Sequence, residues 1–145
     1  MNVLRIIDKI FKPQIAYAHC DVPCGIYKAE PSHTAAETVI KMVEKIEALP
    51  GDNPTVDDRN LFVRCIKVKE EHAELCKREL LILWTDFFKA EHLEKWPDLH
   101  DKVWKAAKLC SENKRTVSLG KAQELLKAAN EIGMILKEAQ EAGKK

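Results

Sequence analysis

The spacing of the apolar residues limits how this chain can fold more than any other feature of its sequence. From about residue 31 onward they recur at intervals of three and four positions. This spacing places them along one side of a helix, whereas a half-buried strand needs an apolar residue at every second position. No stretch of the sequence alternates in that way with comparable strength. The sequence therefore predicts an all-α fold.

Turn-forming residues divide the pattern into four helical segments. A turn at 50–54 (Pro-Gly-Asp-Asn-Pro), a connection at 90–97 that contains Trp96-Pro97, and a polar linker from Ser111 to Thr116 separate them. The predicted helices cover about residues 31–49, 57–89, 99–110 and 118–139. Long helices with short connections favour an antiparallel four-helix bundle. At 145 residues the chain is long enough for one such domain.

The first 18 residues differ in composition from the rest of the chain. They are basic and mildly apolar, but charged residues and Pro13 interrupt the apolar run that a secretory signal needs. Ala16 and Ala18 supply the small side chains that a cleavage after residue 18 would require. We predict that residues 1–18 are a pro-segment removed on maturation and that 19–145 form the domain. Export is the weaker interpretation, so we expect a cytoplasmic protein; an uncut N-terminal helix is the alternative.

The residues that follow the predicted cleavage could bind one metal ion together. Cleavage gives His19 a free amine beside its imidazole, and Cys20 and Cys24 add two thiolates. The amine, the deprotonated peptide nitrogen of Cys20 and the two sulfurs can lie in one plane, which leaves the imidazole as an axial ligand. Planar nitrogen and sulfur ligation favours Ni(II) or Cu(II) over zinc, which prefers a tetrahedron.

This stretch carries a resemblance to a known family. His19-Cys20-Asp21-Val22-Pro23-Cys24-Gly25-Ile26-Tyr27 resembles the nickel-binding hook of the nickel-containing superoxide dismutases, H-C-x-x-P-C-G-x-Y. The segments 83–89 and 92–100 resemble the middle of that family's helical domain. The resemblance implies a homohexamer of four-helix bundles with one nickel ion per subunit and a dedicated maturation protease. It also implies the conversion of superoxide to dioxygen and hydrogen peroxide by one-electron Ni(II)/Ni(III) cycling.

Four further residues of the hook have structural or functional interpretations. Asp21 is either a solvated turn residue or a partner for backbone donors. Pro23 is either an ordinary turn residue or fixes the direction of the loop between the two thiolates, and Gly25 permits a close turn after the second one. Tyr27 either packs the hook against the first helix or, as the resemblance implies, gates solvent and substrate with its hydroxyl.

The chain departs from the family pattern at two positions. The resemblance implies a glutamate on the first helix and an arginine on the second that together hold the hook histidine. Ala35 and His72 stand at those positions here. We expect His72 itself or Glu37 to replace that support.

The remaining cysteines and histidines are expected to be structural. Buried free thiols are common in helical cores, so no metal role is assigned to the three cysteines of the helices. Three histidines lack a partner at ligand spacing and are expected at the surface or an interface. These residues are Cys65, Cys76, Cys110, His33, His92 and His100.

Charge and hydropathy exclude two classes of partner. Removing residues 1–18, which hold three basic residues and one acidic residue, takes the formal charge from +1 to −1. Such a chain has no overall basic field for nucleic acid. No apolar run approaches the length of a membrane span.

Two alternatives to the enzyme stay open on the sequence. The same ligands would serve a nickel or copper binding and delivery protein that does not turn over superoxide. A helical interaction module with a Cys20–Cys24 disulfide would need no metal at all. The superoxide dismutase is the favoured hypothesis.

Overall fold

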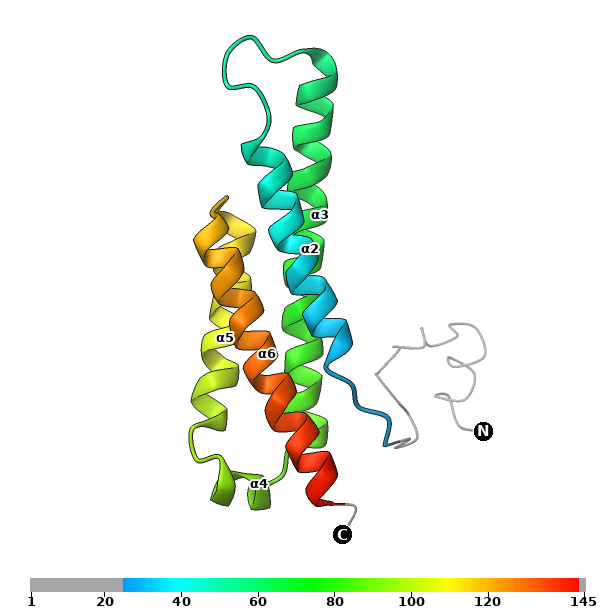
Figure 1. The fold of residues 1–145 in the computed structure, drawn as a ribbon, viewed down its shortest axis with the longest axis vertical. Helices are drawn as coiled ribbons and strands as arrows, with labels where there is room; N and C mark the ends of the chain where they lie inside the picture. Colours follow the sequence, from blue (N-terminus) through cyan, green and yellow to red (C-terminus); the bar gives the residue numbers. More distant parts are fainter. Residues whose placement is uncertain (1–24, 144–145) are drawn as a thin grey trace, which may run out of the picture.

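Four long helices joined by short connections make up the computed structural model, which describes residues 25–143 (Figure 1). No strand occurs within this range, which agrees with the predicted all-α fold. A π-helical turn and one short helix lie between the second and third long helices. In chain order the elements are α2 (Glu30–Glu47), α3 (Val56–Ile82), η1 (Leu83–Phe87), α4 (Ala90–Lys95), α5 (Leu99–Arg115) and α6 (Leu119–Ala142).

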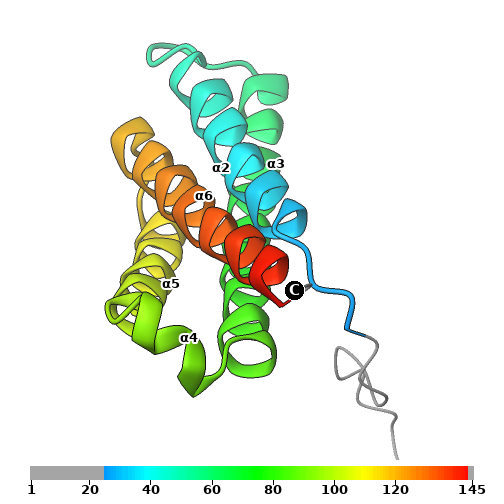
Figure 2. The same cartoon turned by 60° about the horizontal axis from the view of Figure 1, so that its bottom comes forward.

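The long helices run up, down, up and down, so that each is antiparallel to the next along the chain (Figures 1 and 2). Helix α2 packs on α3 and α6, and α5 packs on the same two helices from the other side. The predicted antiparallel four-helix bundle is confirmed.

One apolar core lies where the four helices meet. Its central members are nearly inaccessible to solvent, and many are small enough to let the helix axes approach closely. They include Ala36, Val39, Val43, Ala73, Leu80, Leu99, Val103, Ala106, Leu125 and Ile132, each 0 % exposed. Burial of a leucine or valine side chain contributes about 1.5–3 kcal/mol. The predicted apolar stripes therefore supply the core.

Side-chain caps fix the starts of two helices close to the predicted positions. The hydroxyl oxygen of Thr55 accepts a bond from the Asp58 amide (3.1 Å), and the Asp58 carboxylate accepts one from the Thr55 amide (2.8 Å). This reciprocal pair satisfies two amides that the helix leaves without internal partners. Ser118 caps α6 through the Lys121 amide (3.4 Å).

The predicted linker from Ser111 to Thr116 is wrong, because α5 continues to Arg115. Its one buried polar side chain is bonded within the bundle. The amide of Asn113, which is 1 % exposed, donates to the carbonyls of Leu109 and Lys121 at 3.0 Å. A polar run was thus mistaken for a loop, although its polar groups serve the helix junction.

The end of the predicted second helix also differs. The α-helix ends at Ile82, and the next turn widens into a π-helix in which the Phe88 amide bonds to the Leu83 carbonyl (3.0 Å). The prediction that Lys89 ends this helix is wrong. Lys89 directly precedes α4, and its main-chain N–H donates to Nδ1 of His92 (2.9 Å). The connection at 90–97 accordingly contains a short helix.

The paired ends of α2 and α3 extend beyond α5 and α6 (Figure 1). The first turns of α3 therefore lack a covering helix, and Leu61 and Phe62 remain 42 % and 43 % exposed. These two residues continue the apolar pattern of α3 but lie outside the core.

A buried lysine ammonium caps the C-terminal end of α5. Lys69 on α3 is 1 % exposed, and its Nζ donates to the main-chain carbonyls of Asn113 and Lys114, the latter at 3.1 Å. Carbonyls in the last turn of a helix have no partner within the helix. Lys69 therefore caps α5 from a neighbouring helix, while burial lowers the pKa of its ammonium.

Replacing Lys69 by Met should lower the free energy of unfolding by about 1–3 kcal/mol, because it leaves buried carbonyls without donors. Lys67→Met is the matched control, since Lys67 is exposed and its pair with Glu71 is long at 3.7 Å. Denaturant titration should place that control within about 0.5 kcal/mol of wild type.

The stability difference between wild type and Lys69→Met should also depend on pH. Because the pKa of Lys69 is lower in the folded state than its ordinary 10.5, the unfolded state binds more protons between the two values. The contribution of Lys69 to stability therefore rises with pH, and the difference should widen from neutrality toward 10.5. A difference that narrows over this interval would contradict the assigned effect of burial.

Candidate metal centre

The predicted metal ligands His19, Cys20 and Cys24 lie outside the described residues, as do Asp21, Pro23 and the pro-segment 1–18. Within residues 25–143 no three His, Cys, Asp or Glu side chains gather in a way that could hold a metal ion. The helical cysteines there are buried and free, as predicted. The candidate nickel donors stay those predicted at 19–24, because nitrogen and sulfur ligands suit nickel.

Residues 25–29, which we call the stem, join the predicted ligands to α2. Gly25 follows Cys24 directly and has φ of +68°. This left-handed conformation costs residues with a Cβ about 1–2 kcal/mol but is accessible to glycine. The prediction of a glycine-dependent turn at the exit of the hook is thus supported by the backbone at this residue.

Tyr27 joins the stem to the bundle through its ring, its hydroxyl and its main chain. Its ring lies 5.4 Å from that of Phe87, and its hydroxyl donates to the Asp86 carbonyl at a long 3.5 Å. The amide of Gln140 on α6 donates to the Tyr27 carbonyl at 2.8 Å. Tyr27 therefore packs the stem against the π-turn and α6, whereas the predicted packing was of the hook against the first helix.

The π-turn presents an aromatic wall to this side of the stem. Phe87 stacks on the His92 ring at 5.5 Å and meets Phe88 edge to face at 5.1 Å. An open pocket of about 370 Å³ lies between this wall and the stem, lined in part by Tyr27, Asp86 and Lys89. The hydroxyl of Tyr27 thus has an accessible space beside it; its gating role stays a prediction.

The three histidines that were expected not to bind metal have other partners. His33 lies 2.6 Å from the Asn130 side-chain oxygen, and Trp84 donates its indole N–H to His100 (2.6 Å). His92 accepts the Lys89 amide. These bonds are consistent with structural roles.

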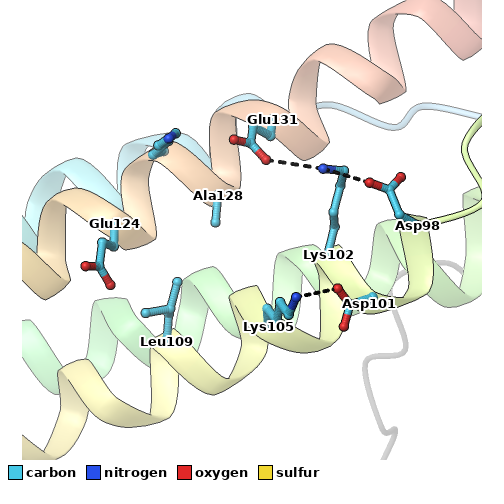
Figure 3. Close-up of a pocket in the computed structure, with 9 residues that line it drawn as sticks. Asp98, Asp101, Lys102, Lys105, Leu109, Glu124, Ala128 and Glu131 are labelled. Carbon is cyan, nitrogen blue, oxygen red and sulfur yellow. Dashed lines mark ion pairs between the residues drawn. The ribbon is translucent and has the colours of Figure 1, made fainter.

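A second pocket, between α5 and α6, is lined by charged side chains (Figure 3). Its lysines are neutralised by neighbouring carboxylates: Lys102 lies 3.0 Å from Asp98 and 3.6 Å from Glu131, and Lys105 lies 2.6 Å from Asp101. The bond to Asp98 raises the pKa of Lys102. Four carboxylates against three ammonium groups make this pocket a poor site for an anion.

Comparison with known proteins places the chain in a family. The profile described as nickel-containing superoxide dismutase matches residues 14–140. Superoxide dismutase [Ni] of Streptomyces seoulensis is 34 % identical over 138 residues, and that of Streptomyces coelicolor is 33 % identical; each alignment covers 94 % of this chain and all of the relative. The chain belongs to the nickel-containing superoxide dismutase family.

Solved structures agree with this assignment. A native nickel superoxide dismutase structure is 33 % identical, with a TM-score of 0.76 over 85 % of this chain and 99 % of that one. A structure with nickel ligation of the oxidised state is 35 % identical, with a TM-score of 0.75 over the same shares. The helical bundle is therefore the fold of the nickel superoxide dismutases.

The two departures from the family pattern line one pocket. Ala35 on α2 and His72 on α3 border a space of about 480 Å³ together with the stem residue Lys28 and with Glu30 at the start of α2. Nδ1 of His72 donates to the Val68 carbonyl at 2.9 Å, which sets the orientation of the ring. The small side chain at position 35 thus leaves room beside His72.

Of the two expected substitutes, His72 is better placed than Glu37. Glu37 does not border the pocket and pairs with His33 at 3.3 Å. Glu30, which the sequence analysis did not consider, brings a carboxylate to the pocket. The sequence does not indicate that Glu30, in the first turn of α2, borders the same pocket as His72.

Substituting Gly25 by Ala should weaken nickel binding, because the left-handed backbone at this residue disfavours a Cβ by about 1–2 kcal/mol. Apart from its two chain neighbours, nothing among residues 25–143 lies within 4 Å of the added carbon, so the cost expected from this part of the chain is conformational. Competition with a chelator measures the loss, expected at about fivefold to thirtyfold in affinity.

Gly25→Asn is the control for backbone conformation, since Asn adopts the left-handed region more readily. It should retain more affinity than Gly25→Ala. Equal losses in the two variants would show that the conformation at Gly25 does not shape the site.

Proposed function

We propose that this protein is a superoxide dismutase that uses nickel held by His19, Cys20 and Cys24. The single observation that carries the proposal is the family match over residues 14–140, which includes the whole nine-residue motif 19–27. The fold supports it, because the bundle is that of solved nickel superoxide dismutases. Superoxide is the substrate, and dioxygen and hydrogen peroxide are the products.

The donor set matches the chemistry that the reaction needs. Bound nickel would supply one-electron oxidation and reduction, with anionic sulfur and amide donors making the higher oxidation state accessible. The amine and imidazole of His19, the amide nitrogen and thiolate of Cys20 and the thiolate of Cys24 would hold the nickel ion. This set depends on a free amine at residue 19, so removal of residues 1–18 is part of the proposal.

The described residues around the stem would support substrate access. The ring of Tyr27 contacts that of Phe87, and Tyr27 lines an open pocket. Its hydroxyl would order solvent there and limit what enters. The ammonium of Lys89 borders the same pocket and would attract an anion locally, although the carboxylates of Asp86 and Glu91 leave the lining with one negative charge in excess. Superoxide is small and needs no larger cavity.

The assembly and maturation of the protein are proposed on the resemblance. A homohexamer would cover each hook with a neighbouring subunit, which protects planar thiolates from oxidation and metal loss. A dedicated protease would remove residues 1–18, and the enzyme would act in the cytoplasm. None of the helices within residues 25–143 is long and apolar enough to cross a membrane.

Removal of residues 1–18 should switch on superoxide dismutation, because it frees the His19 amine as a ligand. The measurement compares cut and uncut protein, each loaded with nickel under reducing conditions and assayed for superoxide removal. We expect activity only in the cut form, with a second-order rate constant approaching about 10⁸–10⁹ M⁻¹s⁻¹.

The other outcomes separate the alternatives. A cut protein that binds nickel but does not remove superoxide would favour the delivery protein. A protein that binds no metal and is unaffected by reductant would favour the interaction module. Copper loading is uninformative here, because copper exceeds nickel in intrinsic affinity at most sites. Activity of the uncut form would disprove the proposed ligand set.

Replacing His72 by Ala should lower nickel occupancy and rate in the cut protein, because His72 borders the pocket where the resemblance expects support for His19. Loss of one hydrogen bond of this kind predicts an effect of about threefold to tenfold. His100→Ala is the control, since His100 bonds to Trp84. Unchanged occupancy and rate in His72→Ala would remove His72 from this role.

A further inference from the structure

The segment that follows the predicted ligands is attached to α6 at three successive places. The Gln140 amide donates to the Tyr27 carbonyl (2.8 Å), Gly133 lies against Ala29, and Asn130 bonds to His33 (2.6 Å). Positions 130, 133 and 140 are three and seven apart, so they fall on one face of the helix. Residues 140, 133 and 130 of α6 contact residues 27, 29 and 33 respectively. The contact made by Gln140 is therefore the nearest of the three to the predicted ligands in the sequence.

Gly133 permits the approach at the middle of this face. A Cβ built on Gly133 would lie 2.9 Å from the Cβ of Ala29, closer than real side chains come. Ala29 has no flexible end that could move aside, so an added methyl group would push the stem away from α6. Glycine inside a helix costs about 1 kcal/mol relative to alanine, which makes this close contact a reason for its presence.

Gln140 fixes the stem nearest to the ligands. Its bond is made to the main chain of Tyr27, a residue outside the helices, and it is partly shielded from water. Tyr27 is three residues from Cys24, and three residues span at most about 10 Å. If Tyr27 moves relative to α6, the short stretch of backbone between Cys24 and Tyr27 must therefore accommodate that movement.

We propose that Gly133 and Gln140 are positioning residues of the nickel site, which act by holding the stem, and with it Tyr27 and the ligand segment, against α6. The proposal rests on the function proposed above. It assigns to the last turns of the bundle a role in how firmly the metal is held and how Tyr27 stands beside the pocket.

The bond from Gln140 is tested with two substitutions. Gln140→Leu removes both polar atoms, and Gln140→Glu keeps the shape but has no donor when ionised. Gln123→Leu, at an exposed position of the same helix, is the matched control. Hydrogen exchange in the metal-free cut protein should speed up at residues 25–29 by about fivefold in both Gln140 variants, and not in the control.

The close contact is tested in parallel. Gly133→Ala should also accelerate exchange in the stem, whereas Gly120→Ala should not, because a Cβ there meets nothing closer than 4.0 Å. Both glycine variants gain helix propensity, so a difference between them reports the contact with Ala29. A cooperative thermal transition at or above the wild-type midpoint in each variant shows that the bundle itself is intact.

Nickel release distinguishes positioning from packing alone. Transfer of nickel to a chelator should be about fivefold faster in Gln140→Leu, Gln140→Glu and Gly133→Ala than in wild type and both controls. Their nickel spectra should shift as well. Faster stem exchange with unchanged release and spectrum would overturn the proposal, and so would unchanged exchange. A wild-type protein that binds nickel but lacks activity would instead refute the proposed function.

Discussion

Mutual burial of four apolar helix faces is the interaction on which the rest of this structure depends. The six residues of the predicted ligand segment, 19–24, precede the stem directly, so any support that this bundle gives them must pass through residues 25–29. The route runs through the stem, which is joined to α6 by Gln140 and faces the π-turn through Tyr27. The bundle therefore acts as a frame, and its contribution to the chemistry is geometric.

Much of the fold could be predicted from the sequence, because breakers and caps are local signals. Helices were expected from Pro31, Asp57 and Ser118, and they begin at Glu30, Val56 and Leu119. The same local logic failed where polar groups find distant partners. The end of α5 looks like a linker until Lys69, more than 40 residues earlier, is seen to cap it.

The candidate site divides in the same way. Its donors can be proposed from the sequence because His19, Cys20 and Cys24 lie close together in a motif whose chemistry is local, and they stay a prediction. The contacts that hold the stem cannot be proposed in this way. Nothing in a charged C-terminal run distinguishes Gln140 from a solvated glutamine, and the value of Gly133 depends on a residue more than 100 positions away.

The placement of the cysteines has a consequence for survival in the presence of peroxide. Cys65, Cys76 and Cys110 are buried, and the pKa of Cys76 is raised, first by its bond to Cys110 and then by burial. Peroxide attacks thiolates, so a thiol kept protonated and out of water reacts slowly. An enzyme that releases peroxide thus carries the cysteines of its helical core where oxidation is slow.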